Sequence, residues 1–137
     1  MNQRDYLEVQ IEQLGRVLKA MLGKMLGTEP EQERVFFEEL NEILKTDFEF
    51  SPDKLSALTN KELDQLLAAA AWNRQNEDYM LQLWLHKAEQ NIGENRLIYT
   101  NMARTWLSAI NRKSDSISFE RLAIAQRLSH LEQTNQS

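Results

Sequence analysis

The sequence has no cysteine, only two prolines and four glycines, and no long apolar run. The absence of cysteine excludes disulfide bonds and thiolate chemistry, and it fits a reducing compartment. Two prolines and four glycines are too few for a low-complexity linker. Apolar residues make up 42% of the chain and charged residues 27%, which are values typical of a globular protein. We therefore predict a single domain over 1–137 whose tail, 132–137, is disordered.

The lack of a long apolar run also bears on location. No window approaches the length of apolar sequence that a membrane span requires. Arg4, Asp5, Glu8 and Glu12 fall where a signal peptide needs an uninterrupted apolar segment. The formal net charge of −5 argues against nonspecific nucleic-acid binding, because phosphate contacts need an excess of Lys and Arg. We expect a cytoplasmic protein with no membrane span and no nucleic-acid partner.

Negative charge is concentrated between Glu29 and Asp53. This segment carries nine acidic residues against Arg34 and Lys45, a local charge of −7, so the remainder of the chain sums to +2. The favoured interpretation is an acidic helix and connector over 28–58 whose charges are solvated. The alternative is a docking surface for a basic partner.

An amphipathic helix is predicted over 1–27. Its apolar residues step alternately by four and three, which is the heptad seam of a coiled coil; they are Leu7, Ile11, Leu14, Leu18, Met21 and Met25. Three interpretations are open: packing against the rest of the chain, self-association as a homodimer through this seam, and binding to a membrane surface. Glu8 and Glu12 weaken the third. Gly15 lies inside the helical pattern, and this predicts close approach of a neighbouring backbone.

Two helix pairs are predicted over 59–131. Thr28 with Glu31, and Thr59 with Glu62, have the spacing of a capping box, in which two side chains satisfy the first turn of a helix. Further on, apolar residues recur at steps of three and four on both sides of a short polar connector: Leu97, Ile98, Met102, Ala103, Trp106, Leu107 and Ile110 before it, and Phe119, Leu122, Ile124, Ala125, Leu128 and Leu131 after it. Ser118 is the expected N-cap of the last helix, and the short connector predicts antiparallel packing.

Both ends of the chain resemble a known family. The closing run Leu107–Leu131, with Ser118-Phe119-Glu120-Arg121 opening its last helix, is similar to the C-terminal end of uncharacterised bacterial helical proteins with tetratricopeptide-like organisation. The opening run, from Arg4-Asp5-Tyr6 to Ile11-Glu12-Gln13-Leu14-Gly15, is similar to the N-terminus of that family. The resemblance implies an α-α repeat fold and brings no activity with it.

A repeat offset points the same way. Helix starts near Asn60 and Glu94 are separated by about the tetratricopeptide period, and this offset matches Leu63 with Leu97, Ala69 with Ala103 and Trp72 with Trp106. The predicted fold class is therefore all-α: an antiparallel helix-hairpin array, a tetratricopeptide-like α-α superhelix, with an N-terminal amphipathic helix.

Residues suited to catalysis are scarce. His86 and Glu89 lie three apart, a spacing that suits a metal-ligand pair, but no second His or Cys pair accompanies them. No glycine-rich phosphate loop is present. We predict no enzymatic activity, no bound metal and no cofactor. A small enzyme or metal-binding protein that uses carboxylates and His86 is kept as an alternative.

The aromatic residues suggest a different kind of site. Most are expected in the core, as is usual for aromatic residues at helical spacing. Exposed ones on helix pairs can form a concave surface that binds a peptide or a partner helix, and the candidates for such a face are Tyr79, Trp84, Tyr99 and Arg104. The predicted function is a protein–protein interaction or assembly module with an unknown protein or peptide partner. A homodimeric structural protein joined through the N-terminal helix is the second interpretation.

Overall fold

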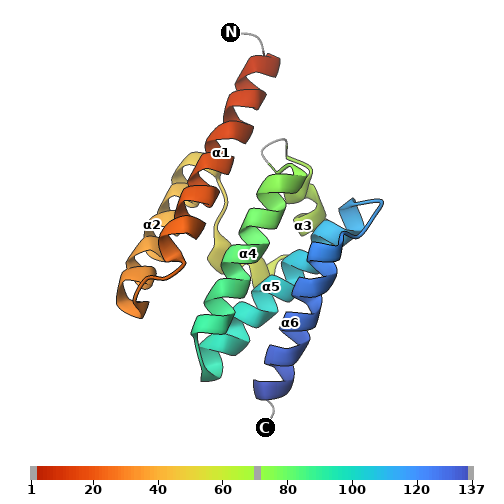
Figure 1. Cartoon of the computed structure of the whole chain (residues 1–137). Coiled ribbons are helices and arrows are strands. Elements are labelled where there is room, and N and C mark those ends of the chain that lie inside the picture. The colour runs from red at the N-terminus through yellow and green to blue at the C-terminus, as the bar shows by residue number, and fades with distance from the viewer. Residues whose placement is uncertain (1–2, 70–71, 136–137) are drawn as a thin grey trace. The chain divides into compact units, whose positions relative to one another are not determined.

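A computed structural model describes residues 3–69 and 72–135, without the side chains of 3–8, 30, 134 and 135. The regular secondary structure of these ranges is helical. The elements are α1 (Gln3–Met25), α2 (Pro30–Phe48), the 3-10 helix η1 (Pro52–Ala57), α3 (Asn60–Leu67), α4 (Arg74–Gln90), α5 (Gly93–Lys113) and α6 (Phe119–Asn135) (Figure 1). No strand occurs in the described ranges. The prediction of an all-α fold is confirmed, and none of the helices so described is long and apolar enough to span a membrane.

The chain divides into two compact units. Unit 1 comprises Met1–Ala57 and Ala68–Met80, and unit 2 comprises Leu58–Leu67 and Leu81–Ser137. The boundary falls inside α4, so the first part of that helix belongs to unit 1 and the remainder to unit 2. The organisation as a single domain stays a prediction.

In unit 1, α1 and α2 form a helix hairpin (Figure 1). The predicted seam of α1 is buried at Leu14, Leu18, Met21 and Met25, while Ile11 is half-buried. The side chain of Leu7 lies outside the described residues. α2 turns its own apolar stripe inward at Phe37, Leu40 and Leu44. The four buried seam positions are therefore covered by the chain itself, as the first of the three interpretations expects. Self-association stays a prediction.

The turn between α1 and α2 differs from the prediction. Gly27 adopts a positive φ of 78°, a conformation that suits a glycine just after the end of a helix. Thr28, however, does not cap α2, and its hydroxyl donates back to the carbonyl of Lys24. Glu29 is the N-cap residue, and it makes no side-chain capping bond. The prediction of a capping box from Thr28 to Glu31 is wrong, since α2 begins one residue later than that box requires.

The connector after α2 returns to the core of unit 1. The backbone N–H of Phe50 donates to the carbonyl of Leu44 at 3.0 Å and closes the end of α2. The Phe50 side chain is buried, and its ring meets that of Trp72 edge to face with centroids 5.3 Å apart. Pro52 opens η1, a short helical turn that follows the connector.

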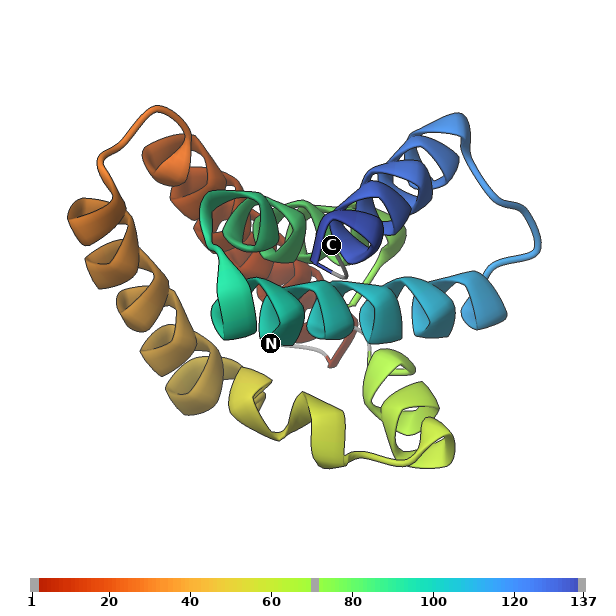
Figure 2. The same ribbon diagram turned by 90° about the horizontal axis from the view of Figure 1, so that it is seen from below.

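In unit 2, α3 and α6 both pack on α5, and α6 reverses direction across α5 after the connector (Figure 2). The capping box at the start of α3 is confirmed: Thr59 N–H donates to Glu62 Oε1 at 3.0 Å, and Glu62 N–H donates to Thr59 Oγ1 at 3.1 Å. Ser118 caps α6 as predicted, because its hydroxyl accepts from the N–H of Arg121 at 3.1 Å. Trp84 and Trp106 are fully buried and meet edge to face at 5.0 Å.

Residues that the predicted repeat matches with each other do not occupy equivalent positions in the structure. Leu63 is 1% exposed, but Leu97, its match one period later, is 47% exposed. Trp72 lies between α3 and α4, whereas its match Trp106 lies within α5. The predicted burial of Leu97 and Ile98 on the inner face of α5 is wrong, because the buried stripe of that helix begins at Thr100 and continues through Ala103, Trp106 and Leu107.

Candidate functional site

The four residues predicted to form a partner-binding face are not all exposed. Trp84 is 0% exposed and packs edge to face on Trp106, so its assignment to that face is wrong. Its ring is core, as aromatic residues at helical spacing usually are. Tyr99 is half-buried beneath the ammonium of Lys87, which lies 5.2 Å from the ring centroid. Tyr79 belongs to the other unit, where it lines a small pocket.

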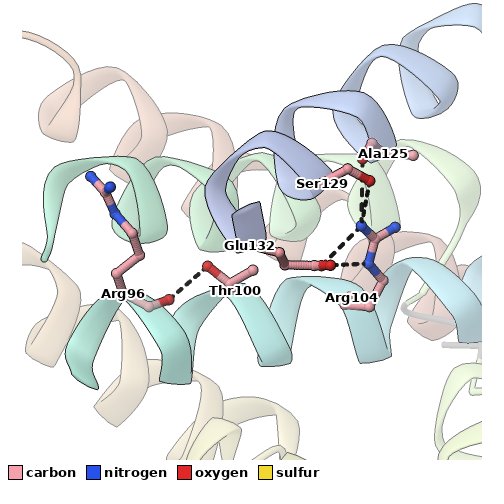
Figure 3. Close-up of polar contacts among 6 residues, drawn as sticks. All are labelled: Arg96, Thr100, Arg104, Ala125, Ser129 and Glu132. Atoms are coloured by element: carbon pink, nitrogen blue, oxygen red, sulfur yellow. Dashed lines mark hydrogen bonds and ion pairs between the residues drawn. The ribbon is translucent and has the colours of Figure 1, made fainter. Parts of the chain in front are cut away.

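Arg104 is used to join two helices. Its Nε donates to Glu132 Oε1 at 3.0 Å, and its Nη2 donates to Ser129 Oγ at 3.1 Å and to the carbonyl of Ala125 at 3.5 Å (Figure 3). All three acceptors lie on α6. The guanidinium therefore joins α5 to α6.

In the alternative metal pair of His86 and Glu89, the glutamate is paired with an arginine. The Glu89 carboxylate accepts two hydrogen bonds from Arg127 of α6, one of them from Nε at 3.1 Å. This fork geometry commits both carboxylate oxygens to a guanidinium. In the portion of the chain that can be searched, no group of three or more His, Cys, Asp or Glu residues could hold a metal ion.

The acidic segment of α2 faces solvent on one side. Glu31, Glu38, Glu39 and Glu42 are exposed, and Val35 lies among them with half its surface in water. Glu33 is the exception, since it is buried on the inner side of the helix. This arrangement suits the favoured interpretation of a solvated helix face.

A groove of about 820 Å³ runs between α1 and the end of α2 in unit 1. Its lining combines three apolar side chains with five polar ones, namely Val9, Gln10, Gln13, Arg16, Val17, Thr46, Asp47 and Phe48. Asp47 is the single carboxylate of this lining. Paired-carboxylate acid–base chemistry therefore has no second partner in the groove.

The most exposed large apolar side chain among the described residues lies at the start of α6. Phe119 is 90% exposed, and Ile117 and Leu122 beside it are each about half exposed. Ser118 is the N-cap, so Ile117 and Leu122 occupy the N′ and N4 positions of a hydrophobic staple, where two apolar residues fix the entry of the chain into a helix. A staple accounts for Ile117 and Leu122. It does not account for Phe119, which stands at the first helical position.

The predicted burial of Phe119 and Leu122 on the inner face of α6 is wrong. The buried stripe of this helix consists of Arg121, Ile124, Leu128 and Leu131, and Phe119 precedes Arg121 by two residues, or about 200° around the helix. A search for apolar residues alone misses the stripe because its first member is an arginine. The Arg121 side chain is 1% exposed, and its Nη1 donates to the carbonyl of Ile110 at 3.3 Å, near the end of α5.

The charges around Phe119 are of two kinds. The cations at the end of α5 are used within unit 2: Arg112 pairs with Asp64 at 2.8 Å, and Lys113 Nζ donates to the carbonyl of Leu67 at 2.7 Å. Asp115 and Glu120, in contrast, are exposed close in sequence to the apolar side chains. We name Ile117, Phe119 and Leu122 with Asp115 and Glu120 the α6 corner. It is an apolar projection with acidic flanks.

Comparison with known proteins adds no family: no family model, curated protein or solved structure matches the chain. The resemblance to the tetratricopeptide-like family stays a prediction.

Proposed function

We propose that the chain is a protein-interaction module and that the α6 corner is its contact surface. The observation that carries the proposal is the 90% exposure of Phe119, directly after the N-cap residue Ser118. Aromatic anchors that fill a pocket on a partner are typical of the energetically dominant residues of interfaces. This anchor lies in the first turn of α6. The proposal also includes a tetratricopeptide-like arrangement of the helices and the absence of catalytic activity.

The partner has a definable chemistry. Burying a phenylalanine side chain is worth about 1.5–3 kcal/mol, which is enough to favour a pocket that encloses the ring. The flanks of the projection are acidic, at Asp115 and Glu120, and the neighbouring cations are already engaged with Asp64 and Leu67. The expected partner is a protein with an apolar pocket rimmed by Lys or Arg, because charge complementarity at the rim steers association and fixes register.

A site-specific cross-linking experiment tests this surface. A photoreactive phenylalanine analogue is placed at position 119 of the full chain in its native cells, and the same analogue is placed at Ile92, which is 81% exposed elsewhere in unit 2. We expect one cross-linked polypeptide from position 119 and none of that mass from position 92. The captured polypeptide is then purified and titrated directly against the unlabelled chain.

The titration decides the proposal. Phe119→Ala should weaken binding by a factor of about 30 or more, which is the effect of removing a residue that contributes about 2 kcal/mol to an interface. Ile92→Ala should leave the affinity unchanged, and raising the salt concentration should weaken the wild-type complex. Equal affinities of the wild type and Phe119→Ala, or identical cross-links from positions 119 and 92, would overturn the assignment of this surface.

A further inference from the structure

A second site lies in unit 1, on the side of α1 that faces the start of α4. It is an open pocket of about 330 Å³, lined by Ile11, Glu12, Gly15, Arg16, Lys19, Asn73, Gln75, Asn76 and Tyr79. Seven of these residues carry polar side chains, whereas only Ile11 and the Tyr79 ring supply apolar surface. The volume is at the lower end of the range of small-molecule sites, which begins at about 300 Å³.

Two cations enter this pocket from one helix face. Arg16 and Lys19 lie three residues apart on α1, a spacing that places their side chains next to each other. Within the described part of the chain, neither cation takes part in a salt bridge. Glu12 supplies one negative charge, so the pocket carries a net charge of +1 in a chain whose total is −5. A local excess of positive charge against this background favours an anionic ligand.

The opposite wall supplies a directed hydroxyl donor. Gln75 Nε2 donates a hydrogen bond to the Tyr79 hydroxyl oxygen at 3.1 Å. Because that oxygen is the acceptor in this bond, its own hydrogen is available to a second acceptor. Arg16, Lys19 and Tyr79 therefore provide three donor side chains in the lining of one pocket, and two of them are charged. Hydrogen bonds from charged donors are stronger than those between neutral groups.

The floor of the pocket is fixed in place. Asn76 is 1% exposed, its side-chain amide donates to the carbonyl of Ile11 at 3.1 Å, and its backbone N–H donates to Asn73 Oδ1 at 2.9 Å. The first-turn amides of Asn76 and Glu77 are thus satisfied by Asn73. A ligand would be held by the side chains of the walls and not by the end of the helix.

We infer that this pocket binds the phosphate monoester of a small, hydroxyl-bearing molecule. The two charges of the phosphate match Arg16 and Lys19, and Tyr79 donates to a third oxygen. The volume exceeds that of phosphate alone, and the remaining wall, Glu12, Asn73 and Gln75, offers oxygen and amide groups that hydrogen-bond to hydroxyls. This inference is independent of the α6 corner, which belongs to unit 2.

Titration of the full chain by heteronuclear NMR tests the site. The probes are inorganic phosphate, glycerol 3-phosphate and glycerol, each at constant ionic strength, with sodium chloride as the salt control. We expect saturable shifts of the Lys19, Gln75 and Tyr79 signals with both phosphates, tighter binding of glycerol 3-phosphate than of inorganic phosphate, and no saturation with chloride.

Variants distinguish binding at this pocket from a general electrostatic effect of the anion. Lys19→Gln and Tyr79→Phe should each weaken glycerol 3-phosphate by about fivefold or more, since each removes one donor while keeping the side-chain stem. Lys24→Gln, on the same helix outside the pocket lining, should not. Unchanged near-ultraviolet circular dichroism verifies the fold of each variant. Equal effects of Lys19→Gln and Lys24→Gln, shifts that chloride reproduces, or equal affinity for the two phosphates would overturn the inference.

Discussion

The side-chain amide of Asn76 in α4 donates a hydrogen bond to the main-chain carbonyl of Ile11 in α1, with the two atoms 3.1 Å apart. This contact explains Gly15, which the sequence places inside a helix. A Cβ atom at Gly15 would lie 3.0 Å from Asn76 Oδ1, closer than such atoms normally approach. The predicted close approach at Gly15 is real, but a buried side chain makes it instead of a backbone.

Two glycines of α1 should respond differently to alanine. Gly23→Ala should stabilise unit 1 by up to about 1 kcal/mol, because alanine is the better helix former and no atom lies within 4 Å of its Cβ position. The change in unfolding free energy for Gly15→Ala should be less favourable than that for Gly23→Ala by about 1 kcal/mol or more, because Asn76 must shift and weaken its bond to Ile11. Urea unfolding measures both, and equal stabilisation by the two substitutions would contradict the contact.

The seam of α1 should contribute to folding and not to assembly. Leu14 is fully buried, so Leu14→Ala should cost about 2–5 kcal/mol of unfolding free energy. Leu26→Ala, at an exposed position just after the same helix, should change it by less than about 0.5 kcal/mol. Light scattering should give the same molar mass for both variants and the wild type. A lower mass for Leu14→Ala with intact helicity would instead identify the seam as an intersubunit contact.

Two arginines of α6 should differ in their contribution to stability. Arg121→Ala removes a buried guanidinium that donates to the Ile110 carbonyl and should cost about 2–3 kcal/mol. Arg127→Ala removes an exposed ion pair with Glu89 and should cost less than about 1 kcal/mol. Thermal or denaturant unfolding measures the stability of both variants, and both substitutions lie in unit 2. Similar losses would show that Arg121 has no special place in the packing of α6 on α5.

The capping box of α3 gives a pH-dependent term. The hydrogen bond from the backbone N–H of Thr59, and then the bond with its side chain, lower the pKa of Glu62 below its ordinary value. A lowered folded-state pKa adds stability that is present above the unfolded pKa and is lost as the pH falls through the folded one. Glu62→Gln should therefore be less stable to unfolding than the wild type at neutral pH, and this difference in stability should disappear in acid. An NMR titration in which Thr59→Ala leaves the pKa of Glu62 unchanged would contradict a role for the hydroxyl.

The elements that the sequence predicts best are those whose signals are local. The box at Thr59 and Glu62 and the cap at Ser118 both follow from residues a few positions apart. The box at Thr28 fails although its spacing is equally good, because α2 begins one residue later, with Glu29 as its N-cap, and the Thr28 hydroxyl donates to the carbonyl of Lys24 in the preceding helix. Spacing shows which bonds are possible. The residue at which the helix begins decides which one forms.

The candidate sites were harder to predict because they depend on which face of a helix is covered. Trp84 was a binding candidate and is core, while Phe119 was a core candidate and is exposed. The second error follows from Arg121, a buried cation that continues the inner stripe of α6 where an apolar residue was expected. The pocket of unit 1 joins Arg16 and Lys19 to Tyr79, which are too far apart in sequence for any spacing rule to connect.

The unfolding free energy of Phe119→Ala tests most directly whether the first turn of α6 serves recognition and not folding. Phe119 is almost fully exposed, so its truncation should change stability by less than about 0.5 kcal/mol, whereas Leu128→Ala, buried on the same helix, should cost about 2–5 kcal/mol. A loss of about 3 kcal/mol or more for Phe119→Ala, as for a core phenylalanine, would contradict the account.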